Sequence, residues 1–218
     1  MRWTAHVRFG DGVCGAVRRV GERVDEELVA RAQGGDRDAF EHIVNVSFDR
    51  CHAVAMRLLR DSQLAEDAVQ QAMVNVWRDL PRLRDPARYD AWSYKLLVRA
   101  CYAEYKKAPP WMPGLEEGSP AEPRTGDEYR AVIDRDQLER GFRRLSMDHR
   151  SVVVLHHYLD LPLDEVGRIL DIPTGTVKSR LHRALAEMRA ALEADTRAAE
   201  AEEPSGCGAP ATGGRVAR

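Results

Sequence analysis

Hydroxyl and basic residues between positions 174 and 184 have the types and spacing needed to contact nucleic acid. Residues 163–170 have the apolar pattern of a short helix, Asp171-Ile172-Pro173 turns the chain, and a second helix follows. A short helix, a turn and a second helix in this spacing predict a helix-turn-helix. The apolar residues of the second helix form one stripe: Val177, Leu181, Ala184, Leu185 and Met188.

The other side of this second helix carries the candidate contacts. At about 100° per residue, Ser179 and Arg183 lie opposite the apolar stripe, with Thr176 and Arg180 beside them. Small side chains let a helix enter the major groove, and arginine reaches guanine edges or phosphates. The predicted DNA-binding residues are Thr176, Lys178, Ser179, Arg180 and Arg183. The alternative is an amphipathic helix with a merely solvated face, but the preceding short helix and the Ile-Pro turn favour recognition.

A second candidate site mixes an aromatic side chain with cations. Residues 90–107 are predicted to form a helix, and one face of it carries Tyr94, Leu97, Val98, Cys101 and Tyr105. The other face carries Trp92, Lys95, Arg99 and Lys106. A tryptophan among cations suits an unstacked base, because the ring stacks on the base and the cations hold the phosphates. The alternative is that Trp92 belongs partly to the core.

A third candidate surface lies on the predicted helix at residues 65–77. Its inward residues are Ala68, Val69, Ala72, Met73 and Val76. The residues left facing outward are Glu66, Asp67, Gln70 and Gln71. An acidic, amide-rich face suits a basic helical partner, although a plain solvated face would have the same composition.

These segments belong to a chain that is predicted to be all-α, with two small helical domains at residues 25–107 and 134–195. Residues 108–133 are predicted to be a flexible linker, because positions 108–130 hold five of the 11 prolines in the chain. Such a density of proline is incompatible with a helix or strand interior. Residues 1–24 and 196–218 show no clean periodicity and are predicted to be a disordered leader and a disordered tail.

Polar residues mark the expected helix boundaries. Helical signals begin at Asp25, Asp36 is an expected N-cap for a helix reaching Leu59, and Asp61-Ser62 precedes the next helix. Ser146 is an expected cap in the second domain. The four helices expected there are Arg135–Leu145, Asp148–Leu159, Asp164–Leu170 and Thr174–Leu192.

Composition excludes several classes of protein. No run approaches the roughly 18 apolar residues of a membrane span, and no apolar stretch follows Arg2 and Arg8, so we expect a cytoplasmic protein without membrane insertion. The net charge is -2, but residues 78–107 hold eight bases and four acids, a basic block that can bind phosphate locally. The four cysteines are scattered, which predicts reduced thiols instead of a disulfide framework or a zinc site.

No catalytic constellation is evident. His156 and His157 are adjacent on a predicted helix and so should point in different directions, unlike the pair of an HExxH motif. There is also no GxSxG motif and no P-loop. The sequence therefore predicts no enzymatic activity, no catalytic or metal-ligating residue and no cofactor.

Two of these segments together resemble the extracytoplasmic-function (ECF) sigma factors of the sigma-70 family. Residues 172–184, with the core Gly-Thr-Val-Lys-Ser-Arg, resemble the region 4 recognition helix. That match alone would leave related response-regulator output domains open. Residues 65–77 resemble sigma region 2.2, and residues 89–101 resemble regions 2.3 and 2.4, in the same order. The resemblance covers about residues 25–107 and 134–193.

The resemblance implies a sigma factor, which binds core RNA polymerase and directs promoter recognition and melting. Region 4 would bind the −35 element, and region 2 would capture a flipped base of the −10 element. The expected −10 contacts are Leu83, Arg84, Arg88, Tyr89, Trp92, Lys95 and Arg99. Leu83 stands where an aromatic is common, and Arg99 stands where many relatives have asparagine, so the base read here can differ from theirs.

The resemblance also implies partners. The face formed by Glu66, Asp67, Gln70 and Gln71 would dock on the clamp helices of the large polymerase subunit, with Gln71 standing where the family often has glutamate. The polymerase flap, promoter DNA and an anti-sigma factor are the other expected partners. The alternative is a stand-alone helix-turn-helix regulator, which would need a dimerisation helix or an effector pocket, and neither is evident.

Overall fold

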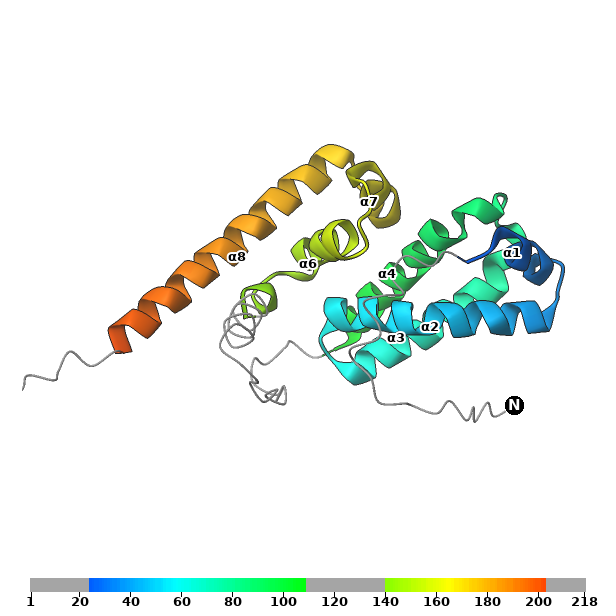
Figure 1. Cartoon of the computed structure of the whole chain (residues 1–218), viewed down its shortest axis with the longest axis horizontal. Helices are drawn as coiled ribbons and strands as arrows, with labels where there is room; N and C mark the ends of the chain where they lie inside the picture. Colours follow the sequence, from blue (N-terminus) through cyan, green and yellow to red (C-terminus); the bar gives the residue numbers. More distant parts are fainter. Residues whose placement is uncertain (1–23, 109–139, 203–218) are drawn as a thin grey trace, which may run out of the picture. The chain divides into compact units, whose positions relative to one another are not determined.

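The computed structural model describes residues 24–108 and 140–202, and every regular element in these ranges is helical, as predicted (Figure 1). The first range contains α1 (Glu26–Gln33), α2 (Arg37–Leu59), α3 (Ser62–Asp79), the 3-10 turns η2 (Leu80–Arg82) and η3 (Pro86–Arg88), and α4 (Tyr89–Lys107). The second contains α6 (Met147–Val153), the π-helical turn η4 (Val154–Tyr158), α7 (Leu163–Leu170) and α8 (Thr174–Glu202). Residues 140–143 are also helical.

Short polar side chains define where the helices begin. The carboxylates of Asp36 and Asp61 accept hydrogen bonds from the backbone N–H groups three residues later, at 3.0 and 2.9 Å. The Ser146 hydroxyl caps α6 in the same way, at 3.2 Å from the backbone nitrogen of His149. Each cap satisfies a backbone donor that has no partner within its own helix. The caps expected at Asp36 and Ser146 are thereby confirmed.

The helices α1 to α4 share an apolar core. Helix α3 packs against both α2 and α4 and buries its small residues, with Ala65, Ala68 and Ala72 all at most 1% exposed. A second part of this core joins α1 to the segment between α3 and α4. Its buried members are Val24, Val29, Ala32, Ala39, Ile43, Val76, Leu80 and Tyr89. Helix α1 and the segment before α4 are therefore parts of one packed body.

The C-terminal boundary of α8 differs from the prediction. The helix continues to Glu202 instead of ending at Leu192, so residues 196–202 are not the disordered tail that was expected. Alanine and glutamate dominate this stretch and are among the best helix formers, so helix can form there without apolar periodicity. The predicted leader up to residue 23, the predicted linker from residue 109 and the tail from residue 203 lie outside the described residues.

The described residues form two compact units. Residues 24–108 and 145–184 belong to the first unit, and residues 140–144 and 185–202 belong to the second. Helix α8 contributes to both. The domain limits proposed from the sequence stay predictions.

In the first unit, a buried arginine connects α6 to α2. Arg150 is 8% exposed and donates hydrogen bonds to the carbonyl oxygens of Leu58 at 2.6 Å and of Leu145 at 3.0 Å. Nearby, the Tyr102 hydroxyl on α4 donates to Asp148 Oδ1 at 2.8 Å. Backbone carbonyls at the end of a helix lack partners within the helix, so Leu58 gains one from Arg150.

The two described cysteines provide a test of this core. Cys51 and Cys101 are free and buried, and burial raises the pKa of each thiol from 9.0 to about 12. Because the thiolate is the reactive form, we expect neither to be alkylated in the folded protein in mildly alkaline buffer, and both to react after unfolding. Peptide mass spectrometry after iodoacetamide treatment measures this. Modification of either thiol at the same rate in native and denatured protein would contradict the core described here.

The same shifts predict a dependence of stability on pH. Each thiol has a higher pKa in the folded state than the 9.0 of a free thiol. Their contribution to stability is therefore fully present below pH 9.0 and is lost progressively as the pH rises toward about 12.

Candidate nucleic-acid interface

Helices α7 and α8 form the predicted helix-turn-helix, and a glycine allows their close approach. Asp171 ends α7 with a left-handed φ of 60°, and the backbone N–H of Ile172 donates to the carbonyl of Gly167 at 3.0 Å. A Cβ atom at Gly167 would lie 2.9 Å from the Ile172 carbonyl oxygen and 3.6 Å from a methyl group of Val177. Any side chain there would push the turn away from α7, so glycine is required for this geometry.

The outer face of α8 presents most of the predicted contacts. Lys178, Ser179 and Arg183 are exposed, and Thr176 is half-buried. The Ser179 hydroxyl donates to the Thr176 carbonyl at 3.0 Å, which keeps this side chain close to the helix backbone. The inner face buries Val177 and Ala184 completely. Leu185, which was expected on the apolar stripe, is instead 39% exposed.

Arg180 is placed differently from its neighbours. Its guanidinium lies 2.7 Å from Asp148 Oδ2 on α6, and its side chain is 26% exposed. Asp148 thus contacts both Arg180 and Tyr102. Arg180 can reach a phosphate only if this ion pair opens or reorients, whereas the exposed Arg183 needs no such change.

The predicted −10 contacts lie on the basic segment before α4 and on α4 itself. Arg84 and Arg88 are exposed, and Arg88 lies 3.4 Å from Asp85 with 71% of its side chain exposed. Leu83 is half-buried against the apolar core. On α4 itself, Trp92 and Lys95 are half-buried and Arg99 is exposed.

The structure corrects the expectation for Tyr89. Its side chain is 1% exposed and belongs to the core, so it cannot contact DNA in this conformation. Helix α4 begins at Tyr89, one residue earlier than predicted, and this first residue turns inward. Burial raises the pKa of its hydroxyl far above the ordinary value. Trp92 also packs against this core, with its ring centroid 6.1 Å from that of Tyr89, so its alternative interpretation as partly core is confirmed.

A partly buried ion pair fixes the start of α4, and the sequence analysis did not predict it. Arg50 on α2 lies 2.6 Å from Asp90 Oδ1, and the two side chains are 7% and 22% exposed. The Arg50 guanidinium also lies 5.4 Å from the ring centroid of Tyr94. The pair holds the N-terminal turn of α4 against α2. An arginine among apolar residues in α2 was the available signal, but its partner is 40 residues away.

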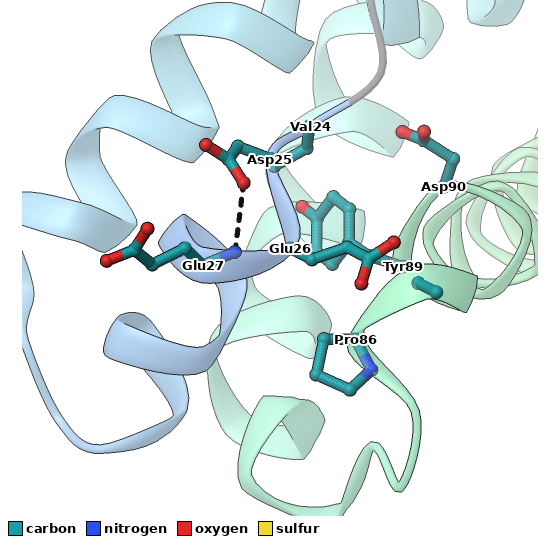
Figure 2. A pocket seen from close by; sticks show the side chains of 8 residues that line it. Val24, Asp25, Glu26, Glu27, Pro86, Tyr89 and Asp90 are labelled. Carbon is teal, nitrogen blue, oxygen red and sulfur yellow. Dashed lines mark hydrogen bonds between the residues drawn. The ribbon is translucent and has the colours of Figure 1, made fainter.

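A pocket of about 490 Å³ lies where the N-termini of α1 and α4 meet (Figure 2). Its lining residues are Val24, Asp25, Glu26, Glu27, Pro86, Ala87, Tyr89 and Asp90. The Asp25 carboxylate caps α1 through the backbone N–H of Glu27 at 3.0 Å, and Asp90 is paired with Arg50. This acidic lining repels phosphate, so the pocket does not extend the basic surface of residues 84–99. Among the described residues, no group of histidine, cysteine and carboxylate side chains could hold a metal ion.

The exposed face of α3 extends beyond the predicted polar residues. Asp67, Gln70 and Gln71 are exposed and Glu66 is half-buried. Further along the same helix, Val74 is 58% exposed and Trp77 is 43% exposed. The Trp77 ring lies edge-on to Phe40, with their centroids 4.6 Å apart. Val74 and Trp77 therefore continue the exposed face that the acidic and amide side chains of α3 begin.

His156 and His157 lie in the π-helical turn η4. His156 Nδ1 lies 2.8 Å from the carbonyl oxygen of Leu161, and the rings of His156 and His157 are 4.7 Å apart. They were expected to point apart, but both belong to the π-helical turn η4, where the spacing between successive side chains differs from that of an α-helix.

In the described part of the chain, no helix is long and apolar enough to cross a membrane.

Known families match both halves of the described structure. Residues 47–108 match the family Sigma-70 region 2, and residues 141–190 match the family Sigma-70, region 4. The first match covers most of α2, α3 and α4, and the second covers the helix-turn-helix. Helix α1 lies before both matches.

Individual proteins show the same similarity. The chain is 33% identical over 181 residues to the ECF RNA polymerase sigma factor SigM of Mycobacterium tuberculosis, covering 81% of this chain and 90% of SigM. A structure of CnrH in complex with the cytosolic domain of CnrY matches with a TM-score of 0.57 at 22% identity, covering 79% of this chain and 99% of CnrH. The sigma factor RpoE of Bartonella quintana, solved with the anti-sigma factor NepR, matches with a TM-score of 0.56 at 19% identity, covering 72% of this chain and 98% of RpoE.

Proposed function

Because this chain belongs to the ECF RNA polymerase sigma factors, we propose that α8 binds the −35 element and that α4 with its preceding segment reads the −10 element. As a sigma factor, the protein binds core RNA polymerase and directs it to promoters for initiation of transcription. The proposal concerns which residues perform each step. We further propose that the protein acts in the cytoplasm with the polymerase and has no catalytic activity or cofactor.

The −35 assignment is carried by one observation, the exposed basic face at the start of the second helix of a helix-turn-helix. Thr176, Lys178, Ser179 and Arg183 lie on the first three turns of α8, which is the part of a recognition helix that enters the major groove. The long guanidinium of Arg183 can reach a base edge, and Lys178 suits a phosphate. Arg180 joins them as a phosphate contact once it leaves Asp148.

The −10 assignment rests on exposed cations next to a half-buried tryptophan. Arg84, Arg88 and Arg99 supply positive charge for the backbone of a single strand. Trp92 keeps part of its ring accessible and Lys95 lies near it on α4, which together suit stacking on an unpaired base. Leu83 is the apolar neighbour of this site, while Tyr89 supports it from the core.

The polymerase-binding face is proposed on α3. Glu66, Asp67, Gln70 and Gln71 present acceptors and amides to the clamp helices of the large subunit, and the polymerase flap would hold region 4. The exposed Val74 and Trp77 would add apolar contact area to the α3 face. We also propose an anti-sigma factor as a regulatory partner, since CnrH and RpoE were both solved as complexes and the latter partner is an anti-sigma factor.

The recognition helix can be tested by two substitutions. Arg183→Ala should weaken −35 binding by about 1–3 kcal/mol and relax selectivity at one position, because it removes a base contact. Arg180→Ala should weaken all sequences alike, because a phosphate contact carries no sequence information. The measurement is holoenzyme affinity for promoter fragments with single changes in the −35 element. Arg189→Ala, an exposed arginine further along α8, is the matched control. Unchanged affinity and selectivity in both test variants would reject this assignment of α8.

The polymerase face can be tested by charge reversal. The double variant Asp67→Lys and Gln70→Lys should abolish holoenzyme assembly, because it places two cations on the acidic face that meets a basic partner. Co-elution with core polymerase in size-exclusion chromatography measures assembly, and circular dichroism checks the fold. Asn45→Lys with Asp49→Lys, on the exposed side of α2, is the matched control. If the α3 variant still co-elutes while folded, the docking face lies elsewhere.

Promoter binding should depend on the polymerase. The isolated chain should bind promoter duplex weakly, because α4 presents a site for an unstacked strand and unstacking costs a few kcal/mol. In addition, Asp148 pairs with Arg180 and accepts a hydrogen bond from Tyr102. In the free protein, Arg180 of α8 is therefore engaged with Asp148 and does not face a phosphate. Fluorescence anisotropy with and without core polymerase measures the difference. Tight and specific binding by the isolated chain would instead favour a stand-alone regulator.

A further inference from the structure

The segment between α3 and α4 is tied to α1 by one side-chain amide. Gln33, the last residue of α1, donates from Nε2 to the carbonyl oxygens of Leu80 at 3.1 Å and Leu83 at 2.6 Å. The amide nitrogen carries two hydrogens, so one group can satisfy both carbonyls. Both groups that face this end of the amide are carbonyl acceptors, so this end must carry the nitrogen.

The backbone–backbone hydrogen bonds described for this segment are local. The N–H of Leu83 donates to the carbonyl of Leu80 at 3.0 Å, and the N–H of Arg88 donates to the carbonyl of Asp85 at 3.1 Å. These bonds close η2 and η3 as turns, but they do not determine where the turns lie relative to the rest of region 2. Gln33 connects them to a separate helix. Apolar packing of Leu80 and Leu83 against the core acts in the same direction.

The end of α1 that carries Gln33 is itself fixed. The N–H of Gly34 bonds to carbonyls of the last turn of α1, and Gly35 takes a φ of 92° that favours glycine. Arg31 then pairs with Asp36 at 2.7 Å, and Asp36 caps α2. The turn from α1 to α2 thus holds the backbone of Gln33 in one place, so its amide is a fixed reference point for Leu80 and Leu83.

We propose that Gln33 is a positioning residue for −10 recognition. Holding the carbonyl of Leu83 fixes where the chain emerges at Arg84, the first exposed arginine of the site, and restrains the path toward η3 and α4. Discrimination between bases needs contacting groups held to within about 0.5 Å, which a segment of two short turns does not provide alone. This inference rests on the proposed −10 role of the segment and adds a residue that touches no DNA.

The test uses the holoenzyme formed by the full chain. Wild-type holoenzyme is first used in run-off transcription across genomic fragments to find a promoter. That promoter, with its −10 positions randomised, is then the probe, and bound fragments are sequenced. Gln33→Met keeps an unbranched side chain of similar length without the donor. It should reduce the ratio of bound fragments with the preferred −10 base to bound fragments with other bases by about fivefold to tenfold. Gln33→Asn keeps the amide but is one methylene shorter, and it should give a similar loss. The −35 preference and the affinity for core polymerase should not change.

Two controls separate positioning from other effects. Val54→Ala removes buried methyl groups from α2, away from this segment, and should lower the melting temperature without altering the −10 profile. Trp92→Ala tests the −10 role itself, because Trp92 is the residue proposed to stack on the base. If Trp92→Ala flattens the profile and Gln33→Met does not, the positioning role is wrong while the proposed function stands. If Trp92→Ala leaves the profile unchanged, the proposed −10 site fails. Equal flattening by Val54→Ala would mean that Gln33 acts through stability alone, which would also overturn the inference.

Discussion

Close packing of α3 against α2 and α4 is the constraint on which the first helices depend. Ala65, Ala68 and Ala72 have almost no exposed surface, and such small side chains let neighbouring helices approach closely. Burying this face turns the acids and amides of α3 outward, where they form the proposed polymerase-binding face. The same packing determines which side of α4 is buried, and so leaves Lys95 and Arg99 on the accessible side. One buried face thus orients two different proposed binding surfaces.

The start of α4 is held by a polar interaction, and this choice has a cost. Removing Arg50 and Asp90 from water is unfavourable, and apolar residues of similar size often stabilise a protein equally well. A charged pair, however, is directional. It fixes the position of one turn of helix more narrowly than apolar contact does, and that turn leads from η3 into the proposed −10 site. The Gln33 amide acts in the same way at the other end of the segment, through the carbonyl oxygens of Leu80 and Leu83.

Local patterns predicted most of the fold, and long-range contacts account for what they missed. The caps at Asp36 and Ser146 and the turn at Asp171 are set by neighbouring residues, so a single sequence was enough to find them. Tyr89 was misplaced because an aromatic at a helix start can face either way, and the core cluster that buries it comes from α1 and α2. Arg50 and Gln33 were missed because their partners lie 40 to 50 residues away. The proposed contacts on α8, and Trp92, Lys95 and Arg99 on α4, came from a pattern of charge and aromaticity, and the remaining −10 contacts came from the family resemblance. The structure adds which of them are accessible.

The distribution of charge explains why such a protein needs the polymerase. The chain has a net charge of -2, so it lacks the general attraction to DNA that a basic protein has. Exposed cations lie at the start of α8 and between Arg84 and Arg99, while Asp25, Glu26 and Glu27 lie at the pocket beside η3. A strand that approaches the proposed −10 site would therefore meet attraction on one side and repulsion on the other, which would guide its path but add little net affinity. The affinity therefore has to come from several weak contacts made at the same time. A polymerase that holds both regions on one promoter allows these contacts to form together.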